Sequence, residues 1–181
     1  MNKNDIVMAR SILTLFTKLG FKKTTMQDIA NVTGLSRQSV YKKYGSKSAC
    51  YEWTVNMYLT DIYMRMFEVM NKNEGDVLNV LHEVFRIFIG EAVEIVNHNH
   101  GTEVLDVVLK ATFSSEEDWH VRFTNRLAQF LDKNKCVSKE KAFGVSITLI
   151  SASKGLLLVE PTEEQFRFDM DIIFRSVLNL E

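Results

Sequence analysis

The sequence contains few residues that interrupt helices. A single proline and only eight glycines occur in 181 residues. It shows no sustained alternation of apolar and polar residues and no Asn-Gly or Asp-Gly hairpin turn, so strand signals are weak. About half of the residues are apolar and about a quarter are charged, which is ordinary globular composition. Long helices are therefore expected, and the predicted fold class is all-α.

Cysteine and long apolar runs are also scarce. Cys50 and Cys136 lie far apart without a CxxC spacing, which favours reduced thiols over a disulfide framework. No signal peptide is evident, and the most apolar segment (144–159) is interrupted by Lys154. This segment is also shorter than the ~20 residues that a bilayer span needs. We expect a cytoplasmic protein with no membrane partner.

Charge is unevenly distributed along the chain. Residues 1–50 contain nine Lys/Arg and two Asp/Glu, a net charge of +7, whereas residues 51–181 have a net charge of −8. This segregation predicts a small basic module that meets a polyanion, followed by a larger acidic body. The alternative is a chance cluster of charges on a solvated face.

Helix signals divide the chain close to the boundary between its basic and acidic parts. Gly20, the pair Thr25/Asp28 and Ser36 mark the ends and starts of three short helices. From residue 47 the pattern changes to six longer amphipathic helices. We therefore predict a small helical domain over 1–46 and a larger helical domain over 47–181.

The second and third short helices have the spacing of a helix-turn-helix. Ala30 lies where two helices must cross closely, Gly34 follows four residues later at the turn, and Val40 comes six residues after that. In this motif the second helix of the pair enters the major groove of DNA. A capped helix pair that is mere scaffold is the less favoured interpretation.

The side chains left facing outward suit contact with DNA. Arg37 can bind guanine with two hydrogen bonds, and Gln38 can pair with adenine or contact phosphate. Hydroxyl and ammonium groups nearby suit backbone phosphates. The predicted DNA-binding residues are Thr24, Thr25, Ser36, Arg37, Gln38, Ser39, Tyr41, Lys42, Lys43 and Lys47.

The stretch "TTMQDIANVTGLSRQSVYKKYGSK" resembles the N-terminal signature of the tetracycline-repressor (TetR) family of bacterial transcriptional regulators. The resemblance covers about residues 5–50, and the departures are small, with Thr33, Ser48 and Ala49 replacing the family's usual residues. It implies that 1–46 is a helix-turn-helix DNA-binding domain and that 47–181 is a helical effector-binding and dimerisation domain. It also implies a homodimer whose interface is a four-helix bundle built from the last two helices of each subunit.

Small and apolar residues near the C-terminus fit such an interface, although an apolar stripe is most often plain core. The predicted interface residues are Ile147, Ser151, Gly155, Phe166, Met170, Ile173, Phe174 and Val177.

Binding of a small-molecule effector is inferred mainly from the family resemblance. Aromatic and sulfur-bearing side chains of the acidic body can line an apolar pocket between helices, or they can form ordinary core. An apolar or aromatic ligand suits this composition better than a phosphate or a sugar. The candidate pocket residues are Trp53, Met57, Tyr58, Met66, Phe85, Phe88, Trp119 and Phe123.

The sequence gives little support for catalysis or a cofactor. His98 and His100 flank Asn99 with Glu103 close by, so a weak metal site is conceivable, but a polar loop is favoured. Cys50 could be an oxidant sensor, but a small packed residue is favoured. We expect no enzyme, no metal and no cofactor.

The function expected from these features is a ligand-responsive transcriptional repressor that binds a palindromic operator as a homodimer. Its two recognition helices (about 36–43) would enter successive major grooves. Lys47→Ala is expected to weaken binding to all sequences and to flatten its salt dependence. Two rivals remain: an architectural DNA-binding protein without an effector, and an all-helical enzyme or small-molecule carrier.

Overall fold

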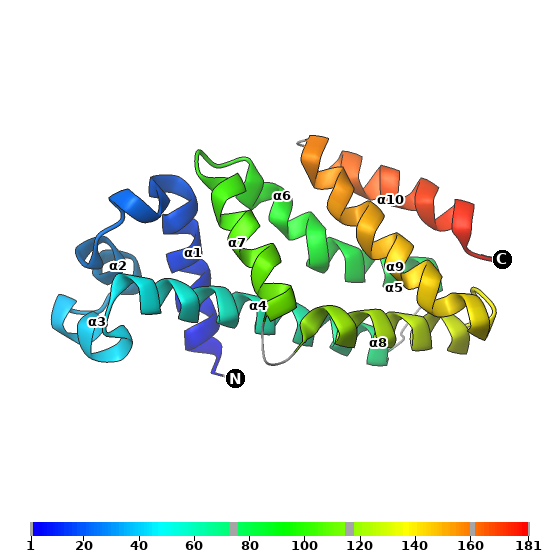
Figure 1. Cartoon of the computed structure of the whole chain (residues 1–181), viewed down its shortest axis with the longest axis horizontal. Helices are drawn as coiled ribbons and strands as arrows, with labels where there is room; N and C mark the ends of the chain where they lie inside the picture. Colours follow the sequence, from blue (N-terminus) through cyan, green and yellow to red (C-terminus); the bar gives the residue numbers. More distant parts are fainter. Residues whose placement is uncertain (1, 73–75, 115–117, 160–161, 181) are drawn as a thin grey trace. The chain divides into compact units, whose positions relative to one another are not determined.

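The computed structural model describes residues 2–72, 76–114, 118–159 and 162–180, and no strand occurs among them. This agrees with the predicted all-α class. Figure 1 shows the helices in chain order. Their bounds are α1 (Lys3–Lys23), α2 (Met26–Thr33), α3 (Arg37–Tyr44), α4 (Lys47–Lys72), α5 (Val77–Phe85), a π-helical turn (Arg86–Gly90), α6 (Glu91–Val96), α7 (Gly101–Ser114), α8 (Trp119–Lys133), α9 (Lys139–Leu156), a 3₁₀ turn (Leu157–Val159) and α10 (Glu163–Val177).

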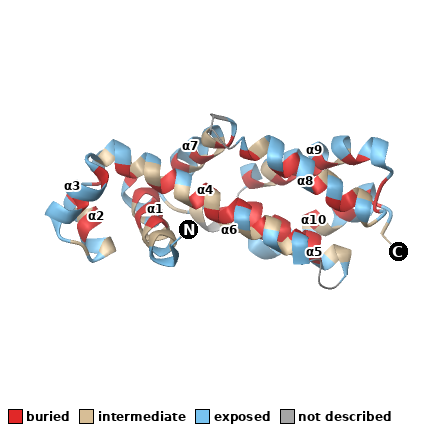
Figure 2. Cartoon of the chain, turned by 90° about the horizontal axis from the view of Figure 1, so that it is seen from below, coloured by how far each residue is buried: buried red, intermediate tan, exposed pale blue. Residues whose placement is uncertain are grey.

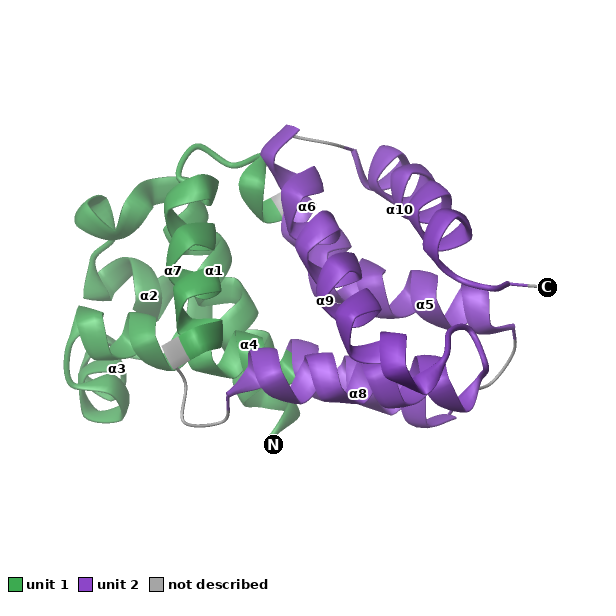
Figure 3. Cartoon of the chain, turned by 45° about the vertical axis from the view of Figure 1, so that its right-hand side comes forward, with its two compact units in different colours: residues 1–61, 95–115 green, residues 62–94, 116–181 purple. Residues whose placement is uncertain are grey.

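The chain folds into two compact units (Figure 3). Unit 1 comprises Met1–Asp61 and Ile95–Ser115, and unit 2 comprises Ile62–Glu94 and Glu116–Glu181. Unit 1 thus contains α7 and the first part of α4 in addition to α1, α2 and α3. The division of functions predicted at residue 46 stays a prediction.

The core of unit 1 forms along α1. Ile12 and Phe16 are fully buried, and Gly20 kinks the helix with φ +77° and ψ 156°. The positive φ agrees with the predicted helix stop, although this ψ is not that of a left-handed cap. A Cβ on Gly20 would lie 3.0 Å from the ring of His100. The backbone N–H of His100 donates to the Thr17 carbonyl at 2.9 Å, so the loop before α7 packs closely on α1.

The core of unit 2 is aromatic. The rings of Tyr63 and Trp119 stack with their centroids 5.0 Å apart, and Phe88 lies 4.9 Å from Phe123. Apolar periodicity in the sequence predicts one helix over about 77–97. In its place the chain forms α5, the π-helical turn and α6.

Polar contacts link the elements of unit 2 at the edge of this core. Arg65, on α4, binds both carboxylate oxygens of Glu91 at 2.8 and 2.7 Å. The buried His82 on α5 lies 2.9 Å from the carboxylate of Asp171 on α10.

Capping residue types in the sequence predict helix starts at Thr102, at Ser115 with Asp118, and at Thr162. Thr162 caps α10 by accepting from the Gln165 amide. Thr102 lies inside the first turn of α7 instead of capping it, and Ser115 lies outside the described residues. Asp118 caps α8 by accepting from the amide of Val121 at 3.4 Å.

Helix α9 is unusually apolar. Within the described residues, the segment Lys139–Val159 is long and apolar enough to cross a membrane by length and composition alone, with a mean hydropathy of 1.7. Only 33% of its most apolar window is buried. The segment is longer than the run identified in the sequence, and much of its apolar surface is exposed.

Candidate nucleic-acid interface

Local hydrogen bonds shape the helix pair α2–α3. The Thr25 hydroxyl accepts from the Asp28 amide at 3.1 Å, and the Asp28 carboxylate accepts from the Thr25 amide at 2.9 Å. This is the predicted capping box. Hydrogen bonds from Thr25 lower the pKa of Asp28. Gly34 ends α2 in the left-handed region (φ 69°, ψ 12°), and Ser36 caps α3 by accepting from the Ser39 amide.

One face of α3 is anchored to the rest of unit 1. Val40 is completely buried and Tyr44 is 7% exposed. The Tyr44 hydroxyl lies 3.0 Å from the Met8 sulfur, and its ring lies 4.9 Å from that of Trp53. Burial raises the pKa of Tyr44. These interactions fix the helix so that its remaining side chains face away from the core.

The outward face of α3 is polar and basic, and most of the helix is pale blue in Figure 2. Its exposed residues are Arg37, Gln38, Ser39, Tyr41, Lys42 and Lys43. The Arg37 guanidinium lies 5.7 Å from the centre of the Tyr41 ring. Lys43 already has a carboxylate partner, because its ammonium lies 2.7 Å from Asp5. We call this set the α3 face.

Lys47 has an internal role in the structure. Its ammonium donates to the carbonyl oxygens of Phe21, Lys22 and Thr24 at 2.7, 3.2 and 2.9 Å. It also lies 4.6 Å from the centre of the Phe21 ring. Carbonyls at a helix end have no partner within the helix, so a lysine here satisfies them. Lys47 therefore holds the end of α1 against the start of α4, and its contact with phosphate stays a prediction.

Thr24 is similarly placed. Its side chain is 1% exposed, and its hydroxyl donates to the Gly20 carbonyl at 2.8 Å. The structure thus gives Thr24 a structural role, whereas Thr25 and Ser36 remain exposed at the starts of α2 and α3. The sequence shows two adjacent threonines, and only tertiary burial distinguishes them.

Comparison with known proteins relates this geometry to one family. The family profile "Bacterial regulatory proteins, tetR family" matches residues 10–52, which span most of α1, all of α2 and α3, and the start of α4. The whole chain also has the fold of solved TetR-family structures, as given below. Residues 10–52 thus match the TetR family directly, and the whole chain resembles that family in fold.

Known proteins match this chain over nearly its full length. The "Biofilm operon icaADBC HTH-type negative transcriptional regulator IcaR" of Staphylococcus aureus is 25% identical, and the match covers 93% of each chain. A proposed TetR-family regulator from Mesorhizobium loti has a TM-score of 0.67 at 14% identity, covering 97% of this chain and 95% of that one. PfmR from Thermus thermophilus, a TetR-family transcriptional regulator, has a TM-score of 0.62 at 17% identity, covering 93% and 97%.

The residues predicted to line an effector pocket fall into both units of the protein. Trp53, Met57 and Tyr58 belong to unit 1, where Trp53 packs against Tyr44. The other five belong to unit 2, and all are buried: Met66, Phe85, Phe88, Trp119 and Phe123. Four of these five are aromatic, and together with Tyr63 their rings pack against one another. The pocket prediction stays untested, but these side chains form core.

A cavity of about 290 Å³ lies elsewhere, in unit 1, between α4 and α7. None of the eight predicted pocket residues lines it. The signal that could have found it is the polar series Ser48, Glu52 and Asn56, which repeats every four residues along one side of α4. Beside it run the apolar residues Tyr51 and Val55.

The predicted dimer residues also separate into two groups. On α9, Ile147, Ser151 and Gly155 are exposed, and their place in an interface stays a prediction. On α10, the structure places Phe166, Met170 and Phe174 in the core of unit 2, each 2% exposed or less, while Ile173 is half-buried and Val177 is 38% exposed. On α9 and α10, the exposed large apolar residues that the interface prediction did not include are Phe143, Phe168 and Ile172.

The remaining candidates for chemistry have ordinary structural roles. The His100 ring lies 3.4 Å from the Glu103 carboxylate, and within the described residues no three metal-ligating side chains come together. Cys50 is fully buried, and burial raises the pKa of its thiol to about 11. The burial of Cys50 agrees with its interpretation as a packed thiol, whereas the interpretation of His98 and His100 as part of a polar loop stays a prediction.

Proposed function

We propose that this TetR-family protein is a ligand-responsive transcriptional repressor that binds a palindromic operator as a homodimer. The single observation that carries the proposal is the α3 face. Its first turn presents Arg37 and Gln38 to solvent, while Val40 fixes the helix from behind. In a helix-turn-helix these first-turn positions face base edges in the major groove.

Repression is proposed from the relative IcaR, which is named as a negative transcriptional regulator. The match to IcaR extends over 93% of each chain and therefore includes much more than the DNA-binding helices. The operator and the genes of IcaR do not transfer at this identity.

Dimerisation is supported by an exposed strip on α9 and α10. Gly144, Thr148, Ser151 and Gly155 follow one another along an exposed side of α9, and small side chains allow two helices to approach closely. Phe143, Ile147, Phe168 and Ile172 add exposed apolar surface. We call these eight residues the α9–α10 face. A second copy of the chain would cover it, which also accounts for the exposed apolar surface of α9 without a membrane.

A dimer makes the operator geometry specific. Two α3 faces related by two-fold symmetry read half-sites about 34–36 Å apart, or a multiple of this distance. An effector releases the operator only as far as it prefers the non-binding state. To weaken operator binding 100-fold, the effector must bind the non-binding state more tightly than the operator-binding state by about 2.7 kcal/mol. By reciprocity, operator DNA must weaken effector binding by the same factor.

The proposal is tested by fluorescence anisotropy of the purified protein with duplex fragments from upstream of its own gene, and with scrambled duplex as the control. We expect tight binding to one fragment. Arg37→Ala is expected to cost about 1–3 kcal/mol and to relax specificity at one base pair. Lys133→Ala, which removes one positive charge from α8, is expected to have little effect. Equal binding of the wild-type protein to every duplex would contradict sequence-specific regulation.

A further inference from the structure

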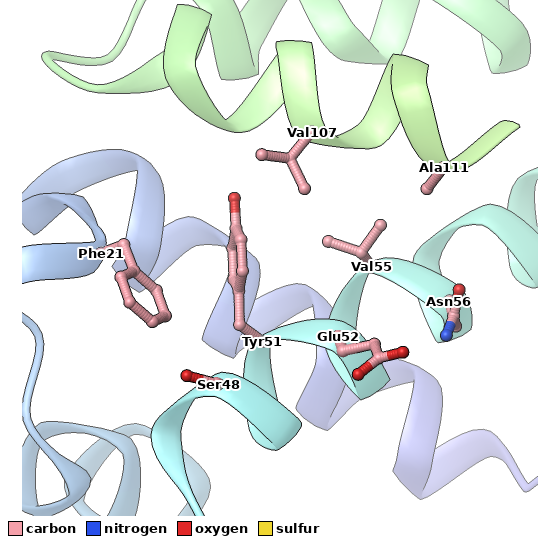
Figure 4. Close-up of a pocket in the computed structure, with 8 residues that line it drawn as sticks. All are labelled: Phe21, Ser48, Tyr51, Glu52, Val55, Asn56, Val107 and Ala111. Atoms are coloured by element: carbon pink, nitrogen blue, oxygen red, sulfur yellow. The ribbon is translucent and has the colours of Figure 1, made fainter. Parts of the chain in front are cut away.

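The cavity in unit 1 has an apolar wall on both sides. Tyr51 and Val55 come from α4, Val107 and Ala111 come from α7, and Phe21 closes one end. Figure 4 shows the two α7 side chains directed toward α4 and the Tyr51 ring directed toward α7. The volume of about 290 Å³ lies at the small end of the range for ligand pockets, about 300–1,000 Å³. It therefore suits a ligand of one or two rings.

The polar rim of the cavity has negative charge. Ser48, Glu52 and Asn56 form it from one side of α4, and Glu52 is the charged residue among the described lining residues. The Glu52 side chain is exposed and makes no ion pair within the described part of the chain. An unneutralised carboxylate at the rim disfavours phosphate or carboxylate ligands and favours a cation.

The aromatic groups of the cavity favour the same charge. The Tyr51 ring lies 5.3 Å from Phe21 and 4.6 Å from Phe16, so neighbouring rings hold it in place. Burial, together with the nearby Glu103, raises the pKa of Tyr51 to about 12, so its hydroxyl stays neutral at pH 7. Aromatic faces attract cations, and the ammonium of Lys47 already lies over Phe21 at 4.6 Å.

We propose that this cavity binds a small aromatic cation, with its ring between Tyr51 and Val107 and its positive nitrogen beside the Glu52 carboxylate. The inference rests on the proposed ligand-responsive function and gives its effector a chemical class. The site adjoins the hydrogen bonds of Lys47, because Phe21 lines the cavity and its carbonyl accepts from Lys47. An occupant therefore touches a residue that joins α1 to α4.

The test is an NMR titration of the ¹⁵N-labelled full chain with benzyltrimethylammonium, one ring with a quaternary nitrogen. We expect saturable amide shifts concentrated in residues 48–56 and 107–111, with a Kd in the millimolar to submillimolar range for so small a probe. Neopentylbenzene, the uncharged analogue of the same shape, is expected to bind at least fivefold more weakly.

Two variants locate the interaction. Glu52→Gln is expected to weaken binding of the cation about five- to tenfold and to leave the neutral analogue unchanged. The matched control is Glu68→Gln, an exposed glutamate of the same helix that does not line the cavity. Val107→Trp, which fills the cavity, is expected to abolish binding of both probes. Amide spectra of each variant show whether the fold is intact.

Three outcomes overturn the inference: no saturable shifts at millimolar probe, equal affinity for the neutral analogue, or equal losses in Glu52→Gln and Glu68→Gln. Its failure is distinguishable from failure of the proposed function, because the titration contains no DNA. Sequence-specific DNA binding without cation binding removes only the ligand site. Cation binding without recognition of any operator removes the repressor function and leaves the site.

Discussion

At the scale of single residues, Lys47 shows how one ammonium group can join two helices. It satisfies three carbonyl oxygens at the end of α1 from the first residue of α4. In Lys47→Met these carbonyls lose a charged donor, so the free energy of unfolding is expected to fall by about 1–3 kcal/mol. Urea denaturation followed by circular dichroism measures this change.

Lys42→Met is the matched control, because Lys42 is exposed on α3. Its stability is expected to stay within about 0.5 kcal/mol of wild type. Its DNA affinity is expected to fall, and the slope of log K against log salt is expected to flatten by about 0.9, because one phosphate is no longer neutralised. If instead Lys47→Met kept full stability and flattened this slope, Lys47 would bind phosphate after all.

Cys50 gives a second prediction at this scale. Its thiol is completely buried, and its pKa of about 11, raised from 9.0, keeps it protonated at neutral pH. Because the thiolate is the reactive form, we expect no fast reaction of Cys50 with Ellman's reagent until the protein is unfolded by denaturant. Because the pKa is raised in the native state, that state favours the neutral thiol. This contribution to stability is present below pH 9.0 and is lost as the pH rises to about 11. Rapid labelling of the native protein at pH 7 would revive the oxidant-sensor interpretation.

At the scale of elements, the turn between α2 and α3 depends on a glycine. Gly34 has φ +69°, and an added Cβ would meet no atom within 4 Å. The expected cost of Gly34→Ala is therefore conformational, about 1–2 kcal/mol of unfolding free energy. Thermal denaturation of Gly34→Ala and Gly34→Asn tests this, because asparagine tolerates the left-handed region better than alanine. Equal losses in the two variants would argue against backbone strain as the cause.

Sequence predicted these short helices well because their ends are determined locally. The capping box of Thr25 and Asp28, the positive φ of Gly34 and the cap at Ser36 each depend on atoms within four residues. The hydrogen-bond acceptors of Lys47 could not be predicted in the same way, because the carbonyl groups that accept from it lie 23 to 26 residues earlier in the chain.

The sequence alone also does not distinguish the buried apolar side of α10 from its exposed apolar side. Phe166, Met170 and Phe174 point into the unit 2 core, while Phe168 and Ile172 are exposed. Both sets repeat at helical spacing, so periodicity alone identifies two candidate faces without saying which is core.

At the scale of the whole molecule, the α9–α10 face predicts an assembly. Ile147 is 39% exposed near the middle of α9, so Ile147→Lys would place a charge within the proposed helix bundle. We expect this variant to be monomeric in sedimentation equilibrium and to lose most of its operator affinity, because two half-sites are no longer bound together.

Val121→Lys is the control for the dimer prediction. Val121 is 47% exposed on α8, outside the α9–α10 face, so the same change in charge should leave the dimer intact. A dimeric Ile147→Lys variant, or two variants that dissociate alike, would place the interface elsewhere.

The discontinuity of unit 1 has a consequence for synthesis on the ribosome. Residues Met1–Asp61 and Ile95–Ser115 belong to one compact unit, so the 33 residues from Ile62 to Glu94 are made before that unit is complete. A nascent chain that ends at Asp61 lacks the loop whose His100 amide bonds to Thr17 and whose ring lies against Gly20. The DNA-binding helices are translated first, but they gain their last supporting helix only after more than half of the chain has been made.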